Sequence, residues 1–144
     1  MTQFKRIAVI AKPDNAGQLK STLSRLQALL DERGLTLLPD RQSAALLGLG
    51  QGAPLSTLAQ NAELAVVVGG DGTLLSAARQ LADHNIPLLG INLGRLGFLV
   101  DISPGDIHQC VGAVLDGRYE EERRFLLSAQ VGQRLDQDGR LHGH

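Results

Sequence analysis

The sequence predicts an α/β protein with an open, mainly parallel sheet and helices on both faces. Short, continuous apolar runs at residues 6–11, 65–68 and 87–91 alternate with segments in which leucine or alanine recurs at helical spacing. A strand that is apolar along its whole length is buried on both faces, and a parallel sheet covered by helices provides that environment. With 144 residues, the chain has room for one such domain, or for one domain and part of another.

The first expected elements are a strand, a long helix and a second strand. Residues 6–11 form the strand, which ends before Lys12 and a turn that contains proline. One face of the helix carries four leucines, namely Leu19, Leu23, Leu26 and Leu30. Gly34 is well placed to end this helix, and residues 35–38 are the second candidate strand.

Residues 41–61 show no clear pattern. Gly48, Gly50 and Gly52 disfavour a long helix in this stretch. Residues 48–53 fit the G-x-G-x-x-A pattern of dinucleotide-binding loops, but no strand precedes them and a proline follows directly. We therefore interpret these glycines as part of a flexible loop.

Residues 65–115 return to a clear alternation of strands and helices. Residues 65–68 and 87–91 are strands, and the helix between them extends to about residue 84. Ser103 and Pro104 suit the N-cap and the first position of a third helix. The apolar stripe of that helix consists of Ile107, Val111, Val114 and Leu115.

The last residues break this alternation. Residues 124–131 resemble a strand, and residues 138–139 are the Asp-Gly pair typical of a hairpin turn. Too few residues follow to complete the hairpin, and natural domains avoid an unpaired strand edge. We expect an N-terminal α/β domain at residues 1–122 and the start of a truncated, β-rich C-terminal domain at residues 123–144. A frayed natural tail is the alternative.

Composition excludes several classes of protein. The formal net charge of −1 and the aromatic content of 3% predict no nucleic-acid partner. The apolar runs are far shorter than the roughly 20 residues that a membrane span needs, so no membrane partner is expected either. A single cysteine excludes an internal disulfide and a multi-cysteine zinc site. We expect a cytoplasmic protein.

Residues 69–73, with the sequence Gly-Gly-Asp-Gly-Thr, are the best candidate for a functional site. They lie between an expected strand and an expected helix, where ligands bind in open α/β sheets. Glycines and a helix N-terminus favour an anion, whereas Asp71 would repel one. The combination suits phosphoryl transfer to an alcohol if Asp71 accepts the hydroxyl proton or acts through a divalent cation. In the alternative interpretation, Asp71 only caps the helix.

These five residues match the GGDGT signature that is shared by NAD kinases, lipid kinases of the diacylglycerol and sphingosine type and, as GGDG, 6-phosphofructokinases. Residues 90–99, Gly-Ile-Asn-Leu-Gly-Arg-Leu-Gly-Phe-Leu, resemble a second motif, the GIN-x-G-x-LGFL segment of bacterial NAD kinases. Lipid kinases carry an LGTGND-like stretch instead. The chain is therefore identified as similar to the N-terminal domain of bacterial NAD kinases.

The resemblance implies a role for each residue of the first motif. Asp71 would be the catalytic proton acceptor for the 2′-hydroxyl of the adenosine ribose. Asp71 and Gly72 would contact the dinucleotide. Gly69 and Gly70 would give the backbone room for phosphates, and Thr73 would start the helix beside a phosphate.

The second motif adds two binding residues by the same resemblance. Phe98 would pack against the nucleotide, or else belong to the core. Asn92 would bond either the ligand or the backbone of its own turn. Arg95 is interpreted as a solvated loop residue, with contact to a phosphate as the alternative. Lys12 is interpreted as an exposed turn residue, with contact to an ATP phosphate as the alternative, because it is a cation that follows the first strand.

The resemblance also implies the substrates and partners. NAD and ATP would be substrates, Mg²⁺ would travel with ATP, and no separate metal site is expected. Polyphosphate as a donor is left open, and a homo-oligomer is expected. The Asn-Glu motif of the family would follow His144, so the fragment is expected to be incomplete for catalysis. A diacylglycerol-type lipid kinase and a non-catalytic nucleotide-binding module are the alternative functions.

Overall fold

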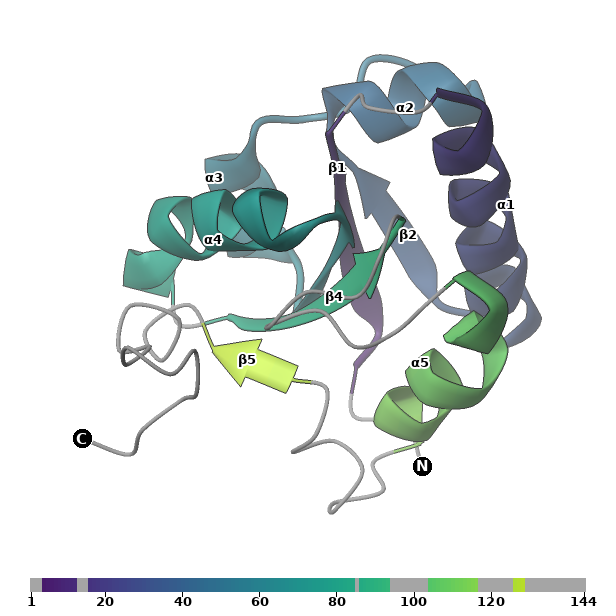
Figure 1. Cartoon of the computed structure of the whole chain (residues 1–144). Helices are drawn as coiled ribbons and strands as arrows, with labels where there is room; N and C mark the ends of the chain where they lie inside the picture. The colour runs from purple at the N-terminus through teal and green to yellow at the C-terminus, as the bar shows by residue number, and fades with distance from the viewer. Residues whose placement is uncertain (1–3, 13–15, 85, 94–103, 117–125, 129–144) are drawn as a thin grey trace.

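The structure, a computed structural model, describes residues 4–12, 16–84, 86–93, 104–116 and 126–128 (Figure 1). Its centre is a five-stranded sheet with the order β2-β1-β3-β4-β5. The strands are β1 (Arg6–Ala11), β2 (Thr36–Pro39), β3 (Leu64–Gly69), β4 (Pro87–Asn92) and β5 (Leu126–Ser128). Strands β1 to β4 pair in parallel, and β5 pairs antiparallel with β4. The expected open, mainly parallel sheet is confirmed.

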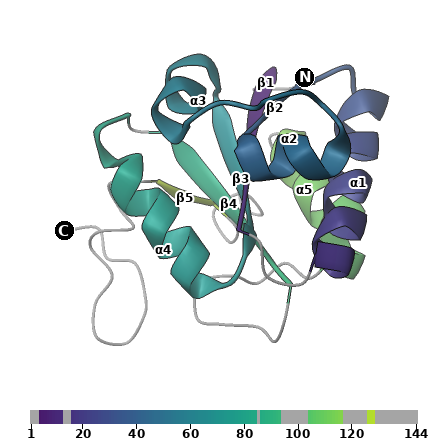
Figure 2. The same ribbon diagram turned by 90° about the horizontal axis from the view of Figure 1, so that it is seen from above.

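Helices cover both faces of this sheet, as expected. They are α1 (Ala16–Glu32), α2 (Arg41–Leu47), α3 (Leu55–Asn61), α4 (Asp71–Gln80) and α5 (Ile107–Leu115), with short 3₁₀ turns η1 (Ala82–His84) and η2 (Pro104–Asp106). Helices α1, α2 and α5 lie on one side of the sheet and α3 and α4 on the other (Figures 1 and 2). The described part of the chain contains no helix that is both long and apolar enough to cross a membrane.

The strands explain why both faces need a cover. In β1, Ile7 and Val9 belong to the core cluster under α1 and α5, whereas Ala8 and Ile10 belong to the cluster under α3 and α4. Successive side chains of a strand point to opposite faces, so a run of apolar residues forms two cores at once. Strand β3 divides its residues between the two clusters in the same alternating way.

Three local features differ from the expectation. The unclear stretch at residues 41–61 contains two short helices, α2 and α3, separated by a segment with glycines. The third helix begins with a 3₁₀ turn at Pro104, and regular α5 starts only at Ile107. Strand β5 joins the edge of the same sheet. The expected domain boundary after residue 122 lies outside the described residues and stays a prediction.

Candidate active site

The order of the strands places a crevice between β1 and β3. From β1 the chain crosses through α1 to β2 on one side, and from β3 it crosses through α4 to β4 on the other side. Helices α1 and α4 lie on opposite faces of the sheet (Figure 2). In open α/β sheets, ligands bind at the carboxyl ends of the strands where the crossover direction changes. The residues that end β1 and β3 therefore define the candidate site.

The first motif forms the end of β3 and the start of α4. Gly69 is the last residue of β3, Gly70 is the N-cap, and Asp71 is the first residue of α4. The first hydrogen bond of the helix runs from Leu74 N–H to the Gly70 carbonyl over 3.1 Å. The N–H groups of residues 71–73 therefore have no carbonyl partner inside the helix, and such groups attract anions.

Position 69 requires glycine because the side chain of Thr73 lies very close to it. A Cβ on Gly69 would lie 2.7 Å from Thr73 Oγ1 and 2.9 Å from Thr73 Cβ. The Thr73 side chain therefore packs onto the end of the strand, where only glycine leaves room. Gly70 and Gly72 face open space, with no atom within 4 Å of a Cβ built there.

The second motif begins beside the first. Asn92, the last residue of β4, is in register with Gly69, and Leu93 N–H donates to the Gly69 carbonyl over 3.0 Å. The structure thus brings the backbone of Asn92 to the strand end that precedes Asp71. Phe98 and Arg95 lie outside the described residues, so their expected positions stay predictions.

A hollow of about 210 Å³ opens next to the first turn of α4. Its lining comes from the end of β1, from the N-cap of α2, from the first residue of α3 and from one face of α4: Ile10, Ala11, Lys12, Asp40, Leu55, Gly72, Thr73, Ser76, Ala77 and Gln80. Sites for drug-sized ligands measure roughly 300–1,000 Å³. The hollow therefore fits one part of a nucleotide, such as its phosphates, better than a whole dinucleotide.

Asp40 also belongs to this region, although no motif in the sequence marks it. It is only 7% exposed, and its carboxylate accepts two backbone hydrogen bonds. Oδ2 accepts from Ala11 N–H over 3.1 Å, and Oδ1 accepts from Ser43 N–H over 2.8 Å. Because aspartate is among the best N-caps, an Asp at the end of a strand was a usable signal for the start of α2.

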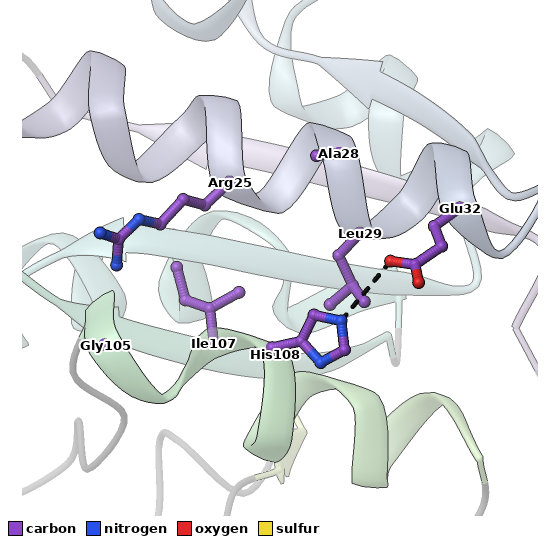
Figure 3. Close-up of a pocket in the computed structure, with 7 residues that line it drawn as sticks. All are labelled: Arg25, Ala28, Leu29, Glu32, Gly105, Ile107 and His108. Carbon is purple, nitrogen blue, oxygen red and sulfur yellow. Dashed lines mark ion pairs between the residues drawn. The ribbon is translucent and has the colours of Figure 1, made fainter.

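A second hollow, of about 270 Å³, lies between α1 and α5 (Figure 3). Figure 3 shows Arg25 and Glu32 of α1 and His108 of α5 around apolar walls that include Leu29 and Ile107. His108 Nε2 lies 3.5 Å from Glu32 Oε2. None of the residues expected at the active site lines this hollow.

The described residues contain no group of three or more His, Cys, Asp or Glu side chains arranged to hold a metal ion. Asp40 brings one carboxylate to the hollow, and both of its oxygens already accept backbone N–H groups.

Comparisons with known proteins agree with this architecture. Residues 7–119 match the sequence profile of the family described as ATP-NAD kinase N-terminal domain. The NAD kinase of Chromohalobacter salexigens is 44% identical over 99% of this chain and 49% of its own length. The NAD kinase of Pseudomonas putida strain W619 is 48% identical over 91% of this chain and 45% of its own length. The chain thus spans about half the length of these curated relatives.

A solved structure shows the same fold. The crystal structure of yeast NADH kinase complexed with NADH has a TM-score of 0.61 and 17% sequence identity. The similarity covers 79% of this chain and 38% of the yeast chain. With the motif at residues 69–73 placed at the crevice of this fold and the family profile matching residues 7–119, the chain belongs to the ATP-NAD kinase family.

Proposed function

We propose that the full-length protein containing this chain is an NAD kinase, which transfers the terminal phosphoryl group of ATP to the 2′-hydroxyl of the adenosine ribose of NAD. The observation that carries the proposal is the position of Asp71 as the first residue of α4, at the strand crevice of a chain that matches the ATP-NAD kinase N-terminal domain. A carboxylate at that position suits a general base for an alcohol.

In the proposed reaction, Asp71 accepts the proton of the 2′-hydroxyl. The ribose oxygen then forms a bond to the γ-phosphorus of ATP, and the bond from that phosphorus to the bridging β–γ oxygen breaks. The products are NADP and ADP. Because phosphoryl transfer requires little covalent chemistry from the protein, positioning and neutralisation of charge supply most of the rate enhancement.

The two substrates would approach Asp71 from different sides. We place the ribose of NAD between Gly72 at the start of α4 and Asn92 at the end of β4, with Phe98 against the nucleotide. The phosphates of ATP would enter the hollow, where the N–H groups of residues 71–73 and the side chain of Thr73 face them. Gly69 and Gly70 would let the backbone approach these phosphates.

Mg²⁺ would enter the site as part of the ATP substrate. This ion is usually held by substrate phosphates together with one or two carboxylates. When bound, it would neutralise charge on the transferred group.

The test uses the full-length gene product with NAD, ATP and Mg²⁺, and an NADP-specific dehydrogenase measures the NADP formed. We expect turnover by the wild type and a loss of about 10²–10⁴-fold in kcat for Asp71→Asn, since the isosteric amide cannot accept the proton. Binding of NAD should survive in this variant. Parallel reactions with polyphosphate in place of ATP determine the range of donors.

Two results would contradict the proposal. Binding of NAD and ATP by the wild type without turnover would indicate a nucleotide-binding module. Phosphorylation of diacylglycerol in place of NAD would indicate a lipid kinase.

A further inference from the structure

Asp40 joins two separate elements at the edge of the hollow. Its Oδ2 holds the N–H of Ala11, the last residue of β1, and its Oδ1 holds the N–H of Ser43 in α2. Its own N–H donates to the Val9 carbonyl over 2.9 Å, and its carbonyl accepts from Ala44 N–H over 2.9 Å. The carboxylate therefore connects the end of β1 with the start of α2.

Capping of α2 does not by itself explain a carboxylate at this position. Asparagine and serine cap helices about as well as aspartate does. Asp40 is 7% exposed, and no lysine or arginine among the described residues pairs with it. Burying an unpaired charge is costly, so its two charge-assisted hydrogen bonds must offset that cost. Only a carboxylate offers an oxygen to each of the two N–H donors.

The residue that directly follows Ala11 is Lys12. Lys12 is exposed and lines the hollow together with Asp40 and Thr73. A lysine ammonium is a compact charge on a flexible stem, so its position depends on where its backbone is held. The hydrogen bond from Ala11 N–H to Asp40 fixes the backbone at the residue that precedes Lys12.

We propose that Asp40 is a positioning residue for phosphoryl transfer: it fixes the end of β1 and thereby places the Lys12 ammonium at the hollow, against the phosphates of the donor. This inference rests on the proposed function, because it assigns the hollow to the phosphoryl donor. Lys12 would contact the donor directly, whereas Asp40 acts only through the backbone of Ala11. NAD would not depend on either side chain.

The test measures steady-state kinetics of the full-length protein with ATP and NAD varied separately. The variants are Asp40→Asn, Lys12→Met, the double variant, and Ser43→Ala as a matched control. Ser43 is fully buried at the same junction, and its hydroxyl donates to the Val9 carbonyl over 3.3 Å. Its replacement leaves both N–H bonds to Asp40 in place, and thermal unfolding shows how far each variant is destabilised.

We expect the KM for ATP to rise about tenfold in Asp40→Asn and in Lys12→Met, the size of one charge-assisted contact. The KM for NAD should stay unchanged, and Ser43→Ala should change neither KM. In the double variant the rise should not exceed that of Lys12→Met alone, because Asp40 acts through Lys12.

Other results overturn the inference. Multiplied effects in the double variant would mean that Asp40 and Lys12 act independently. Equal changes in both KM values, or a loss of melting temperature alone, would mean that Asp40 is only structural. If Asp40→Asn does not fold, Lys12→Met alone still tests the inference. An unchanged KM for ATP in Lys12→Met would show that Lys12 does not contact the donor, and Asp40 could then not act by positioning Lys12. Failure of the wild type to make NADP would instead contradict the proposed function.

Discussion

Gly52 lies against the backbone of Asp40, so closely that a Cβ on Gly52 would be 2.4 Å from the Asp40 carbonyl oxygen. The neighbouring Ala53 forms a parallel bridge with Asp40, and Ala53 N–H donates to the Pro39 carbonyl over 3.1 Å. Glycine at position 52 therefore has a structural reason that is unrelated to any dinucleotide pattern. It lets the chain return past the end of β2.

Gly52→Ala should be strongly destabilising. The residue has a φ of 71°, and the new methyl group would overlap backbone atoms that cannot rotate away. The left-handed conformation and the overlap together should lower the free energy of unfolding by about 3 kcal/mol. Urea denaturation followed by circular dichroism measures the loss.

Gly50→Ala is the matched control for this prediction. Gly50 also has a positive φ, 92°, but nothing lies within 4 Å of its Cβ position. Only the conformational cost should remain, about 1 kcal/mol. Equal losses in the two variants would show that the contact with Asp40 contributes nothing.

Gly69→Ala should disturb the candidate site itself. Its methyl group would push against Thr73, which belongs to the first turn of α4. We expect a loss of about 1–3 kcal/mol in the free energy of unfolding, as for other overpacked positions. Gly72→Ala should leave stability equal or higher, since its methyl group enters open space and alanine favours a helix. Thermal unfolding of both variants checks this, and a larger loss for Gly72→Ala would contradict it.

The alternation of strands and helices was predictable because a strand that is buried on both faces is apolar along its whole length. This pattern is visible in consecutive residues of the sequence. All residues of β3 before Gly69 are apolar and buried, and the leucines of α1 share one face. Helices α2 and α3 show no comparable pattern in the sequence. Each has only seven residues, and helices that short are stabilised mainly by tertiary packing.

The residues of the candidate site were likewise predictable only where they are adjacent in the sequence. The motif at residues 69–73 was recognisable because all of its parts are adjacent in sequence. Asp40 was not, since its contact with Ala11 spans 29 positions and depends on how β2 ends beside β1. The register of Gly69 with Asn92 is likewise a property of the sheet and not of either segment alone.

Glu63 should make stability depend on pH in the acid range. Its carboxylate accepts from Arg6 N–H over 2.9 Å and from Lys5 N–H over 2.6 Å, and these two bonds hold the pKa of Glu63 below its ordinary value of 4.5. Because the pKa of Glu63 is lower in the folded protein than in the unfolded chain, the charged carboxylate stabilises the fold at pH values above the unfolded pKa. This contribution is lost as the pH falls through the folded pKa. Glu63→Gln should therefore be less stable than the wild type near neutral pH. The difference should shrink below pH 4.5.

Urea denaturation of wild type and Glu63→Gln, repeated between about pH 7 and pH 3, measures this difference. The effect should be modest, because the group is partly exposed and water screens its charge. A gap between the two proteins that stays constant over this range would contradict the role of the charged carboxylate.

Helix α5 should depend on its apolar face far more than on its surface ion pair. Ile107 is 2% exposed in the core under α1, so Ile107→Ala should lower the free energy of unfolding by about 2–5 kcal/mol. His108 is the next residue, and its side chain and that of Glu32 are 75% and 65% exposed. An exposed pair contributes about 0–1 kcal/mol, so His108→Ala should change stability by no more than that. Comparable losses for these adjacent residues, measured by urea denaturation, would mean that the contact between His108 and Glu32 holds α5 against α1.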